Sequence, residues 1–327
     1  MIHILLSQQG GYRDVIEHLV AGGARVTNLG PDDVAPSRFR GKLAILASMF
    51  TPKLWRARPR WTRADRVLVI GWQALPLLAA MKLRLLPRPC KILVMACFVH
   101  GAAARRIVNL AWRLLKLPEL GFITFSPGEA RNLVEAVGIP PRRVYRHLWR
   151  QELDGRAEQV GDDGFIFTGG YSNRDYDLLL AAAADVPAPL VIVASSRNQI
   201  SAPLPTHATV HRDLPETEFE RLLARCRVVA MPLKSQGEAC GQSVLLRVLR
   251  NGKPLIATRH EAIEEYLGHD YPGFVAQDDV AAMRATLQRA LSDDGFRAGL
   301  AATIRRAGDR LGQRGSPGQE IEQFLRA

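Results

Sequence analysis

Residues 228–259 read VVAMPLKSQGEACGQSVLLRVLRNGKPLIATR, and this stretch predicts one βαβ unit of a parallel sheet. The apolar runs Val228–Leu233 and Pro254–Thr258 have the length and composition of buried strands. Between them, the polar loop Lys234–Gly241 leads into apolar residues at helical spacing, and Gly252 stands where a helix ends in the left-handed conformation. Parallel sheets bind ligands at the carboxyl ends of their strands, so the loop after the first strand is the predicted binding site.

This loop contains a carboxylate and a cation, and it ends in backbone amides of a helix start, which make no hydrogen bond within the helix. Amides at a helix start and a nearby cation bind phosphate, and a carboxylate accepts hydrogen bonds from hydroxyl groups. The loop therefore predicts a ligand in which a phosphate carries a polyhydroxyl group. The carboxylate, the cation and the amides belong to Glu238, Lys234, Gly241, Gln242 and Ser243.

The composition is that of a soluble globular protein, and 327 residues are enough for two domains. No apolar run approaches the ~20 residues that span a bilayer. The N-terminus, MIHILLSQQGG, lacks a charged region and a cleavage site, so we expect a first core strand there and no signal peptide. Cysteines without CxxC pairing indicate reduced thiols in the cytoplasm, and scattered histidines predict no structural metal.

The positive charge is confined to the first half of the chain. Residues 1–160 hold 25 Lys and Arg against 11 Asp and Glu, a net charge of +14, whereas residues 161–327 hold 19 against 21, a net charge of −2. Such asymmetry indicates an anionic partner for the first half, such as a membrane surface, a lipid-linked phosphate or nucleic acid. General solubility in an arginine-rich proteome is the alternative explanation.

Two basic stretches of the first half also carry tryptophan. Residues 50–66 interleave bases with aromatic side chains, which suits a membrane interface, stacking on nucleic acid, or a solvated loop whose tryptophans pack inward. The helix expected over Arg105–Leu117 has an apolar stripe and several bases, so it could lie on an anionic membrane or pack on the sheet as an ordinary surface helix. The stripe consists of Ile107, Leu110, Ala111 and Leu114; the predicted membrane or acceptor residues are Trp55, Arg56, Arg58, Trp61, Arg105, Arg106, Trp112, Arg113 and Lys116.

Strands and helices alternate along each half, and a polar stretch without periodicity, residues 151–163, separates the halves. We therefore expect an α/β protein with two Rossmann-like domains that face each other across a cleft. The first domain is expected over residues 1–155 and the second over residues 164–311. A last helical segment, residues 312–327, is expected to pack back towards the first domain.

Several motifs resemble those of the GT-B glycosyltransferases, and above all those of family 4 in its broad sense. The likeness covers nearly the whole chain and is strongest from Phe165 to Leu291. It implies the GT-B fold and a nucleotide-diphosphate-sugar donor held mainly by the second domain, with the first domain on the acceptor side. The motifs are Gly10–Gly11 after the first strand, FTGGYSNRDYDLLL from residue 167, MPLKSQGEACGQSVLLRVLRNGKPLIAT from residue 231 and YLGHDYPGFVAQDDVAAMRATLQRAL from residue 266.

The resemblance also implies roles for individual residues. Arg174 and Lys234 would neutralise the diphosphate, Glu238 would hydrogen-bond sugar hydroxyls, and His100 of the first domain would reach the sugar or the acceptor. Arg247 stands where the family has a glutamate that holds the nucleotide ribose. An arginine cannot accept those hydrogen bonds, so we expect it to contact phosphate or to pair with Glu238. The implied catalytic residues are His100 and Glu238, and the implied donor-binding residues are Gly10, Gly11, Gly170, Arg174, Arg212, Lys234, Gly241, Gln242, Ser243 and Arg247.

The expected function is transfer of a sugar from a nucleotide-diphosphate-sugar to a lipid-linked or polysaccharide-precursor acceptor, by a cytoplasmic protein peripheral to the inner face of the cell membrane. No paired-aspartate motif stands in a suitable loop, so we expect a reaction without a metal, and no other cofactor is expected. The expected stereochemical outcome is retention. An inverting transferase, with His100 or Asp14 as base, is one alternative. A non-transferase GT-B enzyme, such as a nucleotide-sugar epimerase, is another, although it would not need a basic first half. No nucleic-acid reader motif is present, so nucleic acid is not an expected partner.

Overall fold

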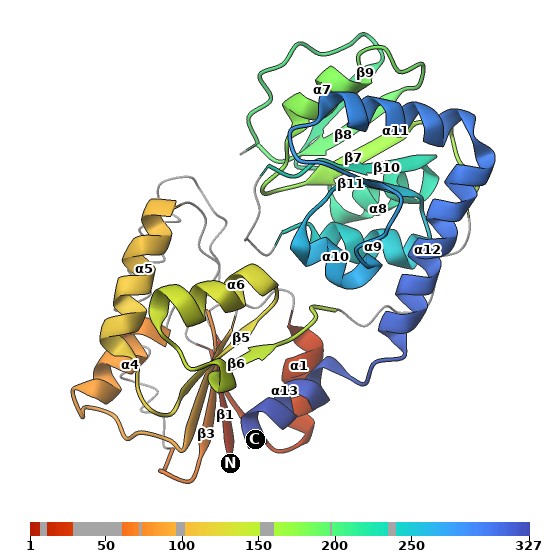
Figure 1. Ribbon diagram of the computed structural model, residues 1–327. Coiled ribbons are helices and arrows are strands. Elements are labelled where there is room, and N and C mark those ends of the chain that lie inside the picture. The colour runs from red at the N-terminus through yellow and green to blue at the C-terminus, as the bar shows by residue number, and fades with distance from the viewer. Residues whose placement is uncertain are drawn as a thin grey trace. The chain divides into compact units, whose positions relative to one another are not determined.

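The computed structural model describes residues 1–6, 12–28, 61–71, 74–95, 102–150, 160–196, 198–234 and 240–327. Contacts divide the chain into two compact units (Figure 1). Unit 1 consists of Met1–Gln151 and Gly315–Ala327, and unit 2 of Glu152–Arg314. Each unit holds its own parallel sheet, so the described residues have the α/β architecture that the sequence predicts.

Unit 1 is built on a parallel sheet with the strand order β2-β1-β3-β4-β5-β6. Its strands are β1 (Ile2–Leu6), β2 (Arg25–Asn28), β3 (Arg66–Ile70), β4 (Lys91–Met95), β5 (Leu120–Thr124) and β6 (Val144–Arg146). Its helices are α1 (Arg13–Ala21), α4 (Ala74–Lys82), α5 (Ala102–Leu115), α6 (Pro127–Arg131), a π-helical turn (Asn132–Val137), a 3-10 turn (Pro141–Arg143) and α13 (Pro317–Arg326).

Unit 2 is built on a second parallel sheet with the strand order β12-β11-β10-β7-β8-β9. Its strands are β7 (Ile166–Gly170), β8 (Leu190–Ala194), β9 (Ala208–Arg212), β10 (Val228–Met231), β11 (Leu255–Thr258) and β12 (Phe274–Val275). Its helices are α7 (Tyr176–Ala183), α8 (Glu216–Arg225), α9 (Gln242–Asn251), α10 (Glu261–Leu267), α11 (Val280–Ser292) and α12 (Asp294–Gly312).

The apolar runs that predict strands are buried on both faces, as helix-covered parallel sheets require. All residues of β7, β10 and β11 are buried. The βαβ unit predicted from residues 228–259 is present as β10, α9 and β11, with β10 and β11 paired in parallel. Gly252 ends α9 with a φ of 60°, the left-handed value that favours glycine.

Helix α13 packs on α1 of unit 1, far from it in sequence. Glu322 lies 3.0 Å from His18 Nε2, and Glu320 accepts a hydrogen bond from Arg150 Nη1 at 2.9 Å. Glu320 also lies 3.0 Å from His147 Nδ1. Burial by itself would raise the pKa of Glu320, but the hydrogen bonds from His147 and Arg150 outweigh it and lower the pKa. These pairs hold the last helix on unit 1.

Among the helices of the described ranges, none has both the length and the apolar character that crossing a bilayer demands.

Candidate functional site

The strand order of unit 2 reverses between β7 and β10. Strand β7 has β8 on one side and β10 on the other, while the chain passes from β7 to β8 and later from β9 across to β10. At such a switch point the loops that follow the two strands diverge and leave room for a ligand at the carboxyl edge of the sheet. These loops are residues 171–175 after β7, and residues 232–241 after β10, of which 235–239 lie outside the described residues.

The two loops are joined to each other by their backbones. Lys234 N–H donates a hydrogen bond to the Asn173 carbonyl at 3.2 Å, and Arg174 pairs with Leu233 as an antiparallel bridge. Asn173 adopts a φ of 53°, a left-handed conformation that asparagine tolerates better than most residues. The structure therefore brings Arg174 and Lys234, which come from separate sequence motifs, to one edge of the sheet.

Arg174 is a buried cation at this edge, with 5% of its surface exposed. Its Nε donates to the Gly169 carbonyl at 3.0 Å and its Nη1 to the Ser172 carbonyl at 2.9 Å. Gly170 has a φ of 138° and no side chain, so its backbone lies directly against the guanidinium. Burial lowers the pKa of Arg174 from its ordinary value, and this effect outweighs the opposing effects of Tyr176 and Cys240.

Other buried charges in the described residues have partners of opposite charge. Asp65 lies 2.7 Å from the N-terminal amine of Met1, and Arg150 lies 2.9 Å from Glu320. Within the described ranges, Arg174 has no carboxylate partner. Leaving a buried charge unpaired costs several kcal/mol, and an anion at the carboxyl edge would offset that cost. Arg174 is thus placed to receive an anionic group.

The start of α9 lies beside this cation. Gly241 occupies the N-cap position with a φ of 80° and supplies no side-chain hydrogen bond to the first turn. A side chain there would meet Met231 Sδ at 3.0 Å and Ile263 Cδ1 at 3.1 Å, so the position requires glycine. Gln242 is buried and Ser243 is exposed. Helix starts of this kind attract anions because their amides point outward along the helix dipole.

The remaining predicted cations of unit 2 are placed differently. The Lys234 side chain is exposed next to the joined loops. Arg212 ends β9, and its Nη1 donates to the carbonyls of Ser195 at 3.0 Å and Asn198 at 3.1 Å, which fixes it to the loop after β8. Arg212 therefore lies on the same carboxyl edge as Arg174, two strands away from β7 in the sheet order.

Arg247 pairs with carboxylates that the sequence did not indicate. Its Nη2 forms an ion pair with Glu216, and its Nε lies 2.8 Å from Glu220, both on α8. The guanidinium also lies 5.0 Å from the centre of the Phe219 ring. The expected contact with phosphate or Glu238 stays a prediction, because Glu238 lies outside the described residues; within the described residues, the contacts of Arg247 tie α9 to α8.

Seven predicted site residues lie outside the described residues, so the structure adds nothing to them. They are Gly10, Gly11, Trp55, Arg56, Arg58, His100 and Glu238.

The prediction that Trp61 and Trp112 face a membrane or acceptor is wrong. Each has only 3% of its surface exposed and packs in the core of unit 1. Trp61 Nε1 donates to the Pro87 carbonyl at 2.7 Å, and the Trp112 ring meets Phe122 edge to face at 5.0 Å. The physical reason is that an indole buries more apolar surface when it packs among the core side chains than when it lies at a surface in contact with water. The four predicted bases of α5 and its end do reach the surface: Arg105 is half-buried, and Arg106, Arg113 and Lys116 are exposed.

Sequence reasoning missed Cys240 and His260, which are both buried at the carboxyl edge of unit 2. Cys240 Sγ lies 3.4 Å from His260 Nε2 and accepts a hydrogen bond from Asn173 Nδ2 at 3.0 Å. His260 Nδ1 accepts from the Ala262 amide at 3.1 Å, which leaves the proton on Nε2. These contacts brace the loop before α9. The signal that could have found His260 is its position two residues after a strand of the same sheet.

Glu129 of unit 1 was also missed. Its Oε2 accepts from the Phe125 amide at 2.7 Å, and Ser126 Oγ accepts from the Glu129 amide at 3.2 Å. This is a capping box at the start of α6, which the Ser–Pro–Gly–Glu spacing could have predicted. Burial raises the pKa of Glu129 to about 7 despite these hydrogen bonds. The carboxyl edge of unit 1 thus holds a titratable group that changes charge near neutral pH.

We expect Glu129→Gln to stabilise the protein in a pH-dependent way. The unfolded chain ionises Glu129 near its ordinary pKa of 4.5, whereas the folded chain keeps the proton up to about pH 7. The wild type therefore loses stability relative to the variant as the pH rises between these values. Thermal unfolding followed by circular dichroism should show a Tm difference that grows through this window and is constant above it. A Tm difference that does not change with pH would contradict the assignment.

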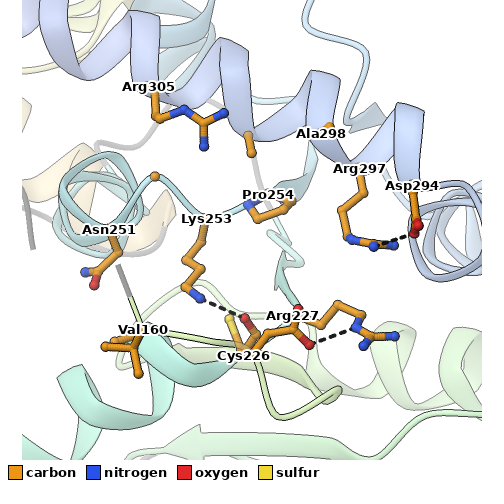
Figure 2. A pocket seen from close by; sticks show the side chains of 14 residues that line it. Val160, Cys226, Arg227, Asn251, Lys253, Pro254, Asp294, Arg297, Ala298 and Arg305 are labelled. Carbon is orange, nitrogen blue, oxygen red and sulfur yellow. Dashed lines mark hydrogen bonds and ion pairs between the residues drawn. The ribbon is translucent and has the colours of Figure 1, made fainter. Parts of the chain in front are cut away.

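A second feature of unit 2, a hollow of about 290 Å³, lies at the opposite end of the strands (Figure 2). Arg227 pairs with Asp162, and Arg297 with Asp294. Lys253 Nζ donates to the Cys226 carbonyl at 3.1 Å. The lining residues 226–227 precede β10, and 253–254 precede β11, so this hollow is at the amino ends of the strands and is separate from the site around Arg174.

The chain was compared with known families and structures. The family described as glycosyl transferases group 1 matches residues 162–293. This segment, and with it most of unit 2, is similar to the group 1 glycosyltransferases. The matched segment contains β7, β10 and α9, and therefore the site around Arg174. The prediction of a glycosyltransferase enzyme is thus confirmed at this level. No curated protein sequence matches the chain.

Solved structures show the same fold over the full chain. A glycosyltransferase from Rickettsia africae is 14% identical, with a TM-score of 0.64, covering 99% of this chain and 96% of that one. An E. coli trehalose-6-phosphate structure with bound UDP-2-fluoro glucose is 11% identical, with a TM-score of 0.68 and coverage of 99% and 98%. A UDP-forming α,α-trehalose-phosphate synthase from Burkholderia vietnamiensis is 13% identical, with a TM-score of 0.68 and coverage of 99% of both chains. These likenesses confirm the GT-B fold with two Rossmann-like domains.

Proposed function

We propose that the protein moves a sugar from a nucleotide-diphosphate-sugar to a lipid-linked or polysaccharide-precursor acceptor, at the cytoplasmic face of the membrane. Unit 2 holds the donor at its carboxyl edge. Arg174 and Lys234 face the diphosphate, the first turn of α9 caps the phosphate or sugar, and Glu238 binds sugar hydroxyls. The sequence resemblance implies further roles for His100, Gly10 and Gly11 of unit 1, which lie outside the described residues.

The observation that carries this proposal is the buried charge of Arg174 at the switch point of the sheet, which has no carboxylate partner among the residues that the structure describes. A diphosphate would supply negative charge to this guanidinium, which the carbonyls of Gly169 and Ser172 hold in place. The E. coli structure among the neighbours contains UDP-2-fluoro glucose, which is a ligand of this chemical class.

In the proposed reaction, the bond between the sugar C1 and the diphosphate oxygen breaks, and its electron pair stays on that oxygen. The acceptor hydroxyl oxygen bonds to C1 on the same face, and its proton passes to the departing diphosphate. Negative charge builds up on the diphosphate in the transition state, where fixed cations and helix-start amides stabilise it. The chain's own cations therefore take the role that a metal ion has in other transferases, and no protein nucleophile is needed.

One observation favours the inverting alternative. Glu129 lies just after β5 of unit 1 and has a pKa of about 7, which suits a general base at neutral pH. The Glu129→Gln variant therefore has a second use. The retaining route leaves its transfer rate close to that of the wild type, whereas an inverting route through Glu129 would lose about a hundredfold or more.

A thermal-shift screen of UDP-, GDP- and dTDP-sugars tests donor binding. We expect sugars of one nucleotide to raise the Tm of the wild-type protein, because a ligand at 100 times its Kd stabilises the native state by about 2.7 kcal/mol. The same donor should not raise the Tm of Arg174→Met. If none of the nucleotide-sugars raises the Tm at millimolar concentration, the proposal is wrong.

A further inference from the structure

Unit 1 exposes aliphatic side chains on two neighbouring elements. On α5, Ile107 is 70% exposed, Leu110 55% and Leu114 61%. In the turn after α4, Leu83 is 70% exposed and Leu85 60%. Helices α4 and α5 pack on each other (Figure 1). Lys82 Nζ at the end of α4 donates a hydrogen bond to the Leu114 carbonyl. We call these five side chains the aliphatic face.

The side of α5 that packs on the core of unit 1 is a different side from the aliphatic face. Helix α5 has a second apolar stripe, at helical spacing, that packs on the core through Trp112 with Val108 and Leu115 beside it. Ile107, Leu110 and Leu114 follow the spacing of another side of the helix, which points away from that core. Single exposed leucines are ordinary, but five on two adjacent elements mark an interaction surface.

Bases surround the aliphatic face, and acids are missing from this part of the chain. Arg84, Arg106, Arg113 and Lys116 are all exposed. Between Asp65 and Glu119 the sequence contains no Asp or Glu at all. Arg84 also has a φ of 61°, so the turn between the two exposed leucines is sharp and holds the arginine between them at the surface.

We propose that the aliphatic face docks unit 1 on an anionic lipid bilayer, with its five side chains below the headgroups and the surrounding bases on lipid phosphates. A shallow apolar surface with a basic rim is the arrangement of helices that lie in a membrane interface. A second copy of this chain fits less well, because a twofold contact would bring the same bases face to face. The inference rests on the proposed function, since it places a membrane-bound acceptor next to unit 1.

Flotation of the full chain with vesicles tests the docking. The vesicles are phosphatidylcholine alone, or phosphatidylcholine with phosphatidylglycerol. We expect the wild type to float with the anionic vesicles and to stay in solution with the neutral ones. Leu110→Asn combined with Leu114→Asn should lower vesicle binding by more than tenfold, because two buried leucines are lost. Arg106→Gln combined with Arg113→Gln should lower it on the order of tenfold. The matched control is Leu204→Asn, an exposed leucine of unit 2 (52% exposed), which should bind as the wild type does.

Three outcomes would overturn the docking: no flotation of the wild type, equal flotation with both vesicle types, or leucine variants that float normally. Light scattering at two protein concentrations tests the alternative that a second copy of the chain binds the aliphatic face. If the leucine variants lose self-association and still bind vesicles, the face is an interface between copies. The donor-induced Tm shift, measured on the same proteins, separates the two proposals. If the wild type floats but shows no Tm shift, the docking proposal stands and the donor proposal is wrong. If the wild type shows a Tm shift but does not float, only the docking proposal is wrong.

Discussion

Replacing Arg174 with methionine is expected to lower kcat/KM for sugar transfer by about a hundredfold or more. The variant loses the only buried cation that lacks a carboxylate partner in the described residues, and with it the charge that we propose faces the leaving diphosphate. Methionine fills a similar volume but leaves the carbonyls of Gly169 and Ser172 without their donor. Initial rates with saturating acceptor, and the Tm of each protein without ligand, separate lost chemistry from lost folding.

Two variants frame this result. Arg174→Lys keeps the positive charge but lacks the planar guanidinium that can donate two hydrogen bonds at once, so we expect a loss of kcat/KM between that of Arg174→Met and none. Arg305→Met removes a partly buried arginine that lines the hollow at the other end of the unit 2 strands, and we expect wild-type transfer from it. If Arg174→Met folds and retains most of its transfer activity, Arg174 has no role at the diphosphate.

Gly170→Ala is expected to weaken donor binding at least tenfold by displacing Arg174. A Cβ at this position would lie 2.6 Å from both Cζ and Nε of Arg174, and the φ of 138° is one that residues with side chains rarely adopt. The guanidinium must therefore move away from its position, or the strand end must change. Calorimetric titration with the preferred nucleotide-sugar should show at least a tenfold weaker Kd, since this is the least that a lost charged hydrogen bond costs.

A matched glycine and a double variant test the mechanism of that loss. Gly299→Ala in α12 adds a Cβ with nothing within 4 Å, so donor affinity should be unchanged. Gly170→Ala in the Arg174→Met background should weaken binding little further, because the two changes remove the same contact. Fully additive losses would mean that Gly170 acts on the donor independently of Arg174.

Much of unit 2 follows from local signals in the sequence. The apolar runs are buried strands because a parallel sheet is covered on both faces, and Gly241 and Gly252 mark the two ends of α9. The switch point follows once the strands are ordered, and it places Arg174 and Lys234 together. The strands and helix ends are predicted correctly because each depends on residues that are close in sequence.

The failures concern contacts between elements. Periodicity predicts one apolar stripe on α5, which includes Leu110, but the structure buries Trp112 in the core and exposes Leu110, because helical spacing alone does not say which side of a helix faces the core. The partners of Arg247, Glu216 and Glu220, lie on another helix and leave no trace in the local pattern. The pKa of Glu129 depends on burial, which only the packed structure defines.

A crystal structure with a bound nucleoside diphosphate would test the central claim most directly, namely that the carboxyl edge of unit 2 holds the donor. We predict a phosphate oxygen within hydrogen-bonding distance of the Arg174 guanidinium, with a phosphate near the first turn of α9. The claim would be contradicted by a diphosphate bound elsewhere, for example in the hollow beside Lys253 and Arg305, with no anionic group near Arg174.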